Sequence, residues 1–135
     1  MKVLFSKDML IGILLSKAKF EIQINNDSKS RLGYSTKLKI NIRGEEDFLL
    51  GVQRSLLQHN ITSHYKKIES KSRQKPILKI SGVVNMNKVK NMIPKHLPDS
   101  NNEWKDFSKA IKIMNSKGHL TLDGFDALLK IKGLI

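Results

Sequence analysis

The stretch DMLIGILLSKAKFEIQIN, residues 8–25, decides the fold of this chain. Its first half places apolar side chains at the spacing of one helix face: Met9, Leu10, Ile13 and Leu14. Its second half alternates apolar with polar residues: Phe20, Ile22 and Ile24 against Glu21, Gln23 and Asn25. Because the first period is about 3.6 residues and the second about 2, the stretch predicts a helix that leads into a half-buried β-strand.

Gly12 and Ser16 lie four residues apart, so they share one face of the predicted helix. A glycine inside a helix costs about 1 kcal/mol relative to alanine. Two interpretations remain open: an ordinary amphipathic helix that tolerates a glycine, or a face of small residues that lets a second helix approach closely. The second interpretation predicts a helix interface made of these residues: Leu10, Gly12, Ile13 and Ser16.

The charge of the chain indicates a polyanionic partner. Lysine and arginine number 25 against 12 aspartates and glutamates, which gives a net charge of +13 and a pI near 10.0. Arginine occurs only at residues 31, 43, 54 and 73, and the other basic residues are lysines. This balance favours contact with phosphates over a site built on bidentate base reading.

Other classes of site and partner are disfavoured by composition. The chain has no cysteine, which excludes disulfides and thiolate metal sites. Its histidines show no metal-ligand spacing: His59, His64, His96 and His119. No stretch approaches the roughly 20 apolar residues of a membrane span. We therefore predict no metal, no cofactor and no membrane partner.

A second alternating run, residues 34–42, follows a polar turn at residues 26–33 and predicts a hairpin with the strand at residues 20–25. Leu38, Ile40 and Ile42 face one side of this hairpin. The other side is polar: Glu21, Gln23, Asn25, Lys37, Lys39 and Asn41. Such a face is either simply solvated or suited to hydrogen bonding with base edges, and the pattern leaves both interpretations open.

The middle of the chain concentrates the positive charge. Gly44 ends the second strand, and a helix over residues 45–60 is predicted from an apolar stripe that includes Leu49, Leu56 and Leu57. Residues 61–68 and 77–82 predict a second hairpin, joined by the basic loop ESKSRQKP. Residues 51–98 contain ten lysines and arginines and a single acid, Glu69. We expect this region to contact phosphates through the following side chains: Lys66, Lys67, Lys71, Arg73, Lys75 and Lys79.

The remainder of the chain predicts helices. Asn85 or Asn87 can cap a short helix that ends before Pro94, residues 96–102 predict a loop, and residues 103–116 predict a longer helix that contains Trp104 as a core residue. Thr121 begins a last helix. The order is therefore helix–hairpin, helix–hairpin, then helices, within one domain that covers residues 1–135.

This order and two motifs resemble the LAGLIDADG homing endonucleases. Residues 10–20, LIGILLSKAKF, are similar to the apolar half of the family signature. Residues 119–125, HLTLDGF, followed by LLKIK, resemble the ending of many organellar members. The earlier segment LKISG…MIPKHLP also resembles the family in its pattern of residues. The resemblance covers nearly the whole chain. It implies an α+β domain of α-β-β-α-β-β-α order, with helices on one face of an antiparallel four-stranded sheet that sits over the DNA major groove. It also implies a homodimer through the signature helices.

The chain departs from the family at the catalytic positions. The signature's two aspartates fall on Leu15 and Lys17, and the second of them is the family's metal-binding, catalytic residue. An ammonium cannot ligate magnesium, so we expect no catalytic residue and no metal. Lys17 would instead neutralise a phosphate.

We therefore expect a catalytically inactive nucleic-acid-binding protein. One alternative is an RNA-binding structural subunit of an organellar ribonucleoprotein, such as the mitochondrial ribosome, or a splicing maturase. Another is an active magnesium-dependent endonuclease that relies on Asp8 or Glu21. The resemblance suggests a mitochondrial or other organellar location, and otherwise a cytoplasmic one.

Overall fold

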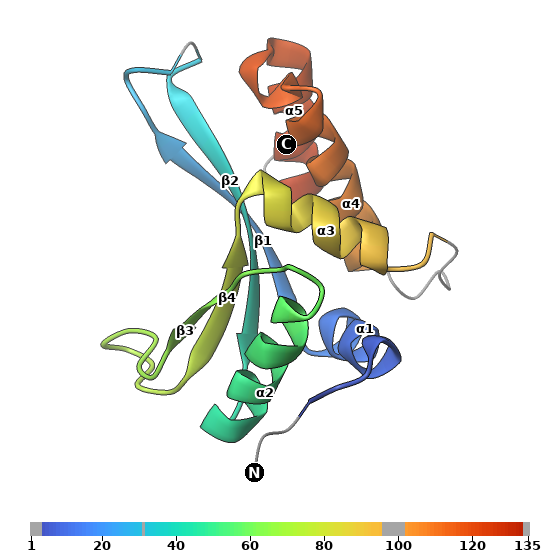
Figure 1. Ribbon diagram of the computed structural model, residues 1–135. Coiled ribbons are helices and arrows are strands. Elements are labelled where there is room, and N and C mark those ends of the chain that lie inside the picture. The colour runs from blue at the N-terminus through green and yellow to red at the C-terminus, as the bar shows by residue number, and fades with distance from the viewer. Residues whose placement is uncertain (1–3, 31, 96–101, 134–135) are drawn as a thin grey trace.

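The computed structural model describes residues 4–30, 32–95 and 102–133. Its helices and strands follow the predicted order (Figure 1): α1 (Lys7–Ser16), β1 (Lys19–Asn26), β2 (Tyr34–Arg43), α2 (Glu46–Leu57), β3 (His64–Lys66), β4 (Ile77–Ser81), α3 (Val83–Met92), α4 (Asn102–Asn115), the 3-10 turn η1 (Gly118–Leu120) and α5 (Leu122–Lys132). His96 and most of the loop predicted at residues 96–102 lie outside the described residues. No helix in the described ranges is both long enough and apolar enough to cross a bilayer.

The strands form one antiparallel sheet in the order β1-β2-β4-β3. The helices lie on one side of this sheet, and the other side is open (Figure 1). The predicted α+β class, with helices on one face of a four-stranded antiparallel sheet, is therefore confirmed.

The register explains why the sheet has one apolar and one polar face. Phe20 lies opposite Ile40, which lies opposite Ile80. Ile22 pairs with Leu38 in the same way. Because successive side chains of a strand point to opposite faces, these residues all face the helices. The core that they form also contains Leu10 and Leu14 of α1, Leu49, Val52 and Leu56 of α2, and Trp104 of α4.

Local interactions set the helix starts that the sequence predicted. Gly44 follows β2, and the acidic Glu46 and Asp47 occupy the first turn of α2. Thr121 caps α5, because its Oγ1 accepts a hydrogen bond from the backbone N–H of Gly124 at 3.1 Å. Leu57 was predicted in the apolar stripe of α2, but it is 53% exposed at the end of the helix and lies outside the core.

Two predicted elements need correction. The third strand covers only His64–Lys66, because the residues before it bond elsewhere: Ile61 donates to the Leu56 carbonyl and Thr62 donates to Asn85 Oδ1. The predicted cap at Asn85 or Asn87 is also wrong, since α3 already begins at Val83. Asn85 instead ties the segment before β3 to the end of β4, because its Nδ2 donates to Thr62 Oγ1 and to the Ser81 carbonyl. Asn87 pairs with Asn115 of α4.

Candidate nucleic-acid interface

The open face of the sheet is a continuous polar surface. By the strand register, Lys19, Asn41, Lys79 and His64 form one row across all four strands. A second row consists of Glu21, Lys39 and Ser81, and Gln23 lies opposite Lys37 in a third. We call this surface the open face and define it by its polar and charged strand residues: Lys19, Glu21, Gln23, Asn25, Ser35, Lys37, Lys39, Asn41, Arg43, His64, Lys66, Lys79 and Ser81.

The structure brings most of the predicted binding residues together here. All six polar residues predicted in the first hairpin lie on the open face, and so do Lys66 and Lys79. Lys19, Arg43 and His64 were not among the predicted residues, although Lys19 and Arg43 extend the alternating pattern of the first hairpin by one period. Their contact with nucleic acid, like that of the predicted residues, stays a prediction.

Two amide oxygens on the open face have no hydrogen-bond partner among the described residues. They are Gln23 Oε1 and Asn41 Oδ1, and both atoms are buried. Asn41 as a whole is only 7% exposed. Buried acceptors are usually satisfied in folded proteins.

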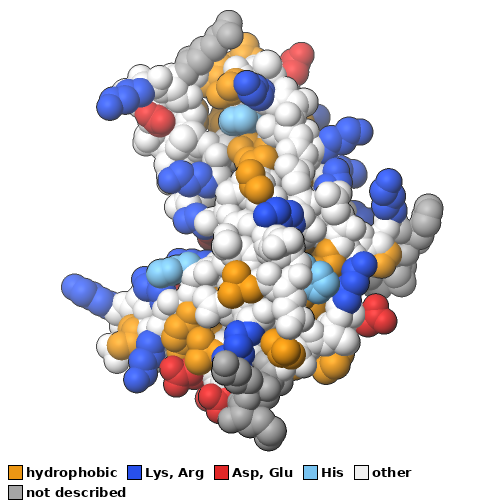
Figure 2. Space-filling model, in the orientation of Figure 1, with side chains coloured by type: hydrophobic (Ala, Val, Ile, Leu, Met, Phe, Trp, Pro, Cys, Tyr) orange, Lys and Arg blue, Asp and Glu red, His pale blue; other side chains and the backbone are white. Residues whose placement is uncertain are grey.

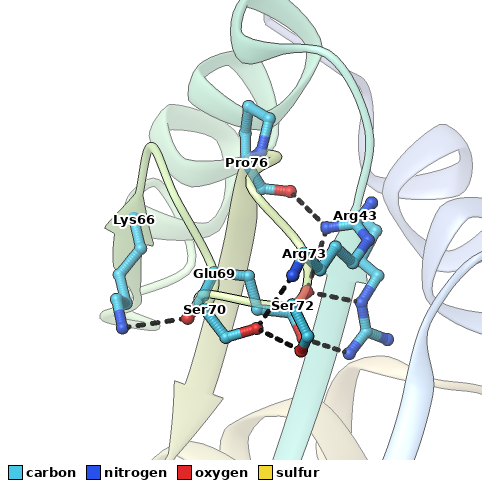
Figure 3. A network of polar contacts seen from close by, with 7 residues as sticks. All are labelled: Arg43, Lys66, Glu69, Ser70, Ser72, Arg73 and Pro76. Atoms are coloured by element: carbon cyan, nitrogen blue, oxygen red, sulfur yellow. Dashed lines mark hydrogen bonds and ion pairs between the residues drawn. The ribbon is translucent and has the colours of Figure 1, made fainter.

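Glu69 organises the basic loop between β3 and β4 (Figure 3). Its two carboxylate oxygens each accept from Arg43, at 2.8 Å from Nε and 2.8 Å from Nη2. Arg73 Nη1 donates to the same carboxylate at 2.9 Å and to the Pro76 carbonyl at 3.3 Å. The Glu69 backbone also closes the loop, because its N–H donates to the Lys75 carbonyl. We call Arg43, Glu69 and Arg73 the Glu69 network.

The Glu69 network fixes charge as well as shape. The hydrogen bonds from Arg43 are the main reason that the pKa of Glu69 falls to about 2, so the carboxylate stays ionised. The same bonds raise the pKa of Arg43. Ile77 lies on the open side of β4, opposite Arg43, and is nevertheless fully buried. The network therefore holds the loop against the sheet.

This arrangement changes the interpretation of the basic loop. Arg73 was predicted to contact phosphate, but its Nη1 is engaged inside the loop. Lys66 Nζ likewise donates to the Glu69 carbonyl at 3.2 Å. The other predicted loop lysines are exposed: Lys67, Lys71 and Lys75. In the space-filling view, Lys and Arg side chains lie along the open side of the molecule, which is hollowed between the first hairpin and this loop (Figure 2).

Lys17 lies at the C-terminal end of α1 and belongs neither to the open face nor to the Glu69 network. Its backbone N–H donates to the Ile13 carbonyl, and its Nζ lies 5.0 Å from the centroid of the Phe48 ring. Asp8 is nine residues earlier, about 14 Å away along the helix. Glu21 is on the open face. Within the described residues, no three His, Asp or Glu side chains cluster closely enough to hold a metal ion. The residues at this helix end do not fit a magnesium site.

The predicted interface residues of α1 differ in exposure. Leu10 is fully buried in the core of its own chain, and the interface itself stays a prediction. Gly12 and Ser16 are exposed and Ile13 is partly exposed. A side chain added at Gly12 would meet no atom within 4 Å. Met9, which is 55% exposed, lies near them on the outside of the helix and was not selected.

The comparisons with known proteins concern the fold. No family model matches the sequence, and no curated protein matches it. Among solved structures, the homing endonuclease I-TnaI has 19% sequence identity and a TM-score of 0.79, and the match covers 96% of this chain and 86% of that one. The LAGLIDADG homing endonuclease I-LtrWI, bound to its target DNA, has 20% identity and a TM-score of 0.79. That match covers 97% of this chain and 44% of I-LtrWI.

A third similar structure gives the same result. The LAGLIDADG meganuclease I-CpaMI, bound to uncleaved DNA, has 21% identity and a TM-score of 0.77 over 95% of this chain and 44% of that one. The chain therefore spans less than half the length of I-LtrWI and I-CpaMI. Agreement at this level over nearly all of the chain means that the protein has the fold of the LAGLIDADG homing endonucleases.

Proposed function

We propose that this protein binds nucleic acid across the open face and does not cleave it. The single observation that carries the proposal is the open face itself. It is a sheet surface left free by the helices, and its cations outnumber its one acid, Glu21. The lysines of the open face and the exposed loop lysines would hold phosphates, while Gln23 and Asn41 would contact bases.

Salt dependence tests this proposal. Each phosphate contact in duplex DNA contributes about 0.9 to the slope of log affinity against log salt. We expect Lys37→Ala and Lys39→Ala each to reduce that slope by about this amount. Lys112→Ala, on the exposed side of α4, is the matched control and should leave the slope unchanged. Equal losses in all three variants would show that the charge, and not the open face, drives binding.

Absence of cleavage is the second part of the proposal. The support is that Lys17 and Leu15 occupy the positions that match the signature's aspartates, and that Asp8 lies at the other end of α1. We expect no nicking of supercoiled DNA with magnesium. Magnesium-dependent nicking that disappears in Asp8→Asn or Glu21→Gln would instead establish an active endonuclease.

We also propose that two copies associate through the exposed side of α1, around Gly12 and Ser16. Such a dimer would place two open faces side by side along a duplex. A protein that is monomeric at micromolar concentration would instead favour a subunit of a ribonucleoprotein. Nucleic acid recovered with protein from its native source separates these functions. Recovery of RNase-sensitive material of discrete size would support the organellar ribonucleoprotein or maturase, and DNase-sensitive fragments of one sequence would support DNA binding.

A further inference from the structure

The Glu69 network presents one edge of Arg43 outward. A guanidinium has five N–H donors, and Glu69 accepts from Nε and from one N–H of Nη2. The remaining donors are both N–H groups of Nη1 and the second N–H of Nη2. None of these has a hydrogen-bond partner among the described residues, and Nη1 points away from Glu69 (Figure 3). Arg43 therefore carries a free pair of parallel donors in a fixed orientation.

The position of Arg43 on the sheet and the geometry of its two free N–H donors indicate which ligand this donor pair can bind. Arg43 is the last residue of β2 and lies on the open face, with about 37% of its side chain exposed. Two parallel N–H donors match the O6 and N7 acceptors that guanine shows in the major groove. An arginine that is already held by a carboxylate loses less side-chain freedom when it binds a base.

The open face favours duplex DNA over RNA as the ligand. Its described strand residues include no Phe, Tyr or Trp side chain on which an unpaired base could stack, because Phe20, Tyr34 and Tyr65 alternate toward the helix side. His64 on the edge strand β3 is the one ring among these residues, whereas single-strand binding uses several stacking rings in succession. The deep groove of duplex RNA is too narrow for side chains to read bases. The major groove of DNA, in contrast, admits β-strands.

We infer that Arg43 is a specificity-determining residue that reads a guanine in duplex DNA, and that Glu69 is the positioning residue that orients it. This inference rests on the proposed function, because it requires nucleic acid on the open face. It differs from the alternative in which Glu69 only shields Arg43 and Arg73 from the nucleic acid. The two ideas predict opposite effects when the Glu69 charge is removed.

The test is selection from a pool of duplex DNA with random sequence, followed by affinity measurements on the selected site. We expect the wild-type protein to select guanine at one position. Replacing this guanine with 7-deazaguanine, which lacks the N7 acceptor, should weaken wild-type binding by about tenfold. Arg43→Ala removes every side-chain donor at this position and should be insensitive to the replacement. Glu69→Gln should lose most of the guanine preference at this position and keep its preferences elsewhere. Lys112→Ala should behave as wild type.

Each remaining outcome has a defined meaning. A Glu69→Gln protein that binds every sequence more tightly, with its guanine preference intact, would show that Glu69 only shields the arginines and would overturn the inference. A wild-type protein that binds the pool without selecting any guanine would also overturn it, while leaving phosphate binding by the open face in place. Binding to RNA but not to duplex DNA would overturn it too. Failure to bind any nucleic acid would overturn the proposed function as well. Should Glu69→Gln fail to fold, as judged by circular dichroism, Arg43→Ala still decides whether Arg43 reads the guanine, and Glu69→Asp, which keeps the charge on a shorter side chain, tests whether Glu69 orients it.

Discussion

The helices α1 and α2 carry the same pair of small residues in different surroundings. Gly12 is followed four residues later by Ser16, and Gly51 by Ser55. In both helices the serine Oγ donates to the glycine carbonyl, at 2.6 Å in α1 and 2.8 Å in α2. In α2 the pair is buried, and Ser55 Oγ also accepts from the Phe5 N–H at 2.8 Å. In α1 both residues are exposed.

The hairpins that follow these helices differ too. The first is held by eight facing residue pairs between β1 and β2. The second has only three pairs between β3 and β4, and the Glu69 network holds its loop. The first helix–hairpin unit therefore leaves the glycine–serine pair of its helix exposed and has a long hairpin. The second buries this pair and uses ion pairs to complete its shorter hairpin. The same glycine–serine spacing therefore has different roles in the two helices, because it is buried in α2 and exposed in α1.

The largest expected effect separates the two glycines. Gly51→Leu would force a large side chain into a buried position, and we expect a loss of about 2–3 kcal/mol in the free energy of unfolding. Gly12→Leu enters open space, so we expect a gain of up to about 1 kcal/mol from helix propensity. Urea denaturation, at a concentration where the protein is monomeric, measures both. Similar losses in the two variants would break the comparison.

Gly12→Leu also tests what covers α1. If a second copy packs closely over Gly12 and Ser16, the leucine side chain should weaken self-association by at least tenfold, which is about 1.4 kcal/mol. Sedimentation velocity across a concentration series measures this change. Lys112→Ala is the control and should leave association unchanged. A Gly12→Leu protein that associates as tightly as wild type would place the interface elsewhere.

The two serines give a smaller difference. Ser55→Ala removes the acceptor of the Phe5 N–H in a part-buried position, so we expect a loss of about 1–2 kcal/mol. Ser16→Ala removes one exposed hydrogen bond to the helix backbone and should change stability by less than about 0.5 kcal/mol. Thermal unfolding followed by circular dichroism distinguishes the two. A large loss for Ser16→Ala in the monomer would show that α1 depends on a contact that burial does not reveal.

Most of the fold was predictable from the sequence because it follows from local periodicity. The change from helical spacing to alternation at residues 8–25 correctly located α1 and β1, and Gly44 and Thr121 marked real boundaries. The errors arose where hydrogen bonds to residues far away in the sequence determine the local structure. The Asn85 side chain bonds to Thr62 instead of capping α3, and β3 is short because its neighbours bond outside the sheet.

The candidate site was predictable only in part, for a related reason. Alternation placed Glu21, Gln23 and Lys39 on one face without any knowledge of packing. Whether a charged side chain is available depends on a partner far away in sequence, and Arg43 and Glu69 are 26 residues apart. The sequence therefore suggested a loop of available cations, whereas the structure shows Arg73 engaged by Glu69.

A further small effect concerns how the stability of the second hairpin depends on pH. The folded protein holds the pKa of Glu69 at about 2, below its ordinary value of 4.5. A depressed pKa stabilises the folded state above the ordinary value, and this contribution is lost as the pH falls from about 4.5 toward 2. We expect Glu69→Gln to be about 1 kcal/mol less stable than wild type at pH 7, and the difference to vanish near pH 2. Asp126→Asn, on the exposed side of α5, is the control, since Asp126 forms no ion pair with any described residue, whereas Glu21 contributes to the raised pKa of Arg43. Denaturant unfolding at pH 7 and pH 3 measures these differences. If the Glu69→Gln difference is the same at both values, ionisation of Glu69 does not hold the loop, and the ion-pair account of the second hairpin is wrong.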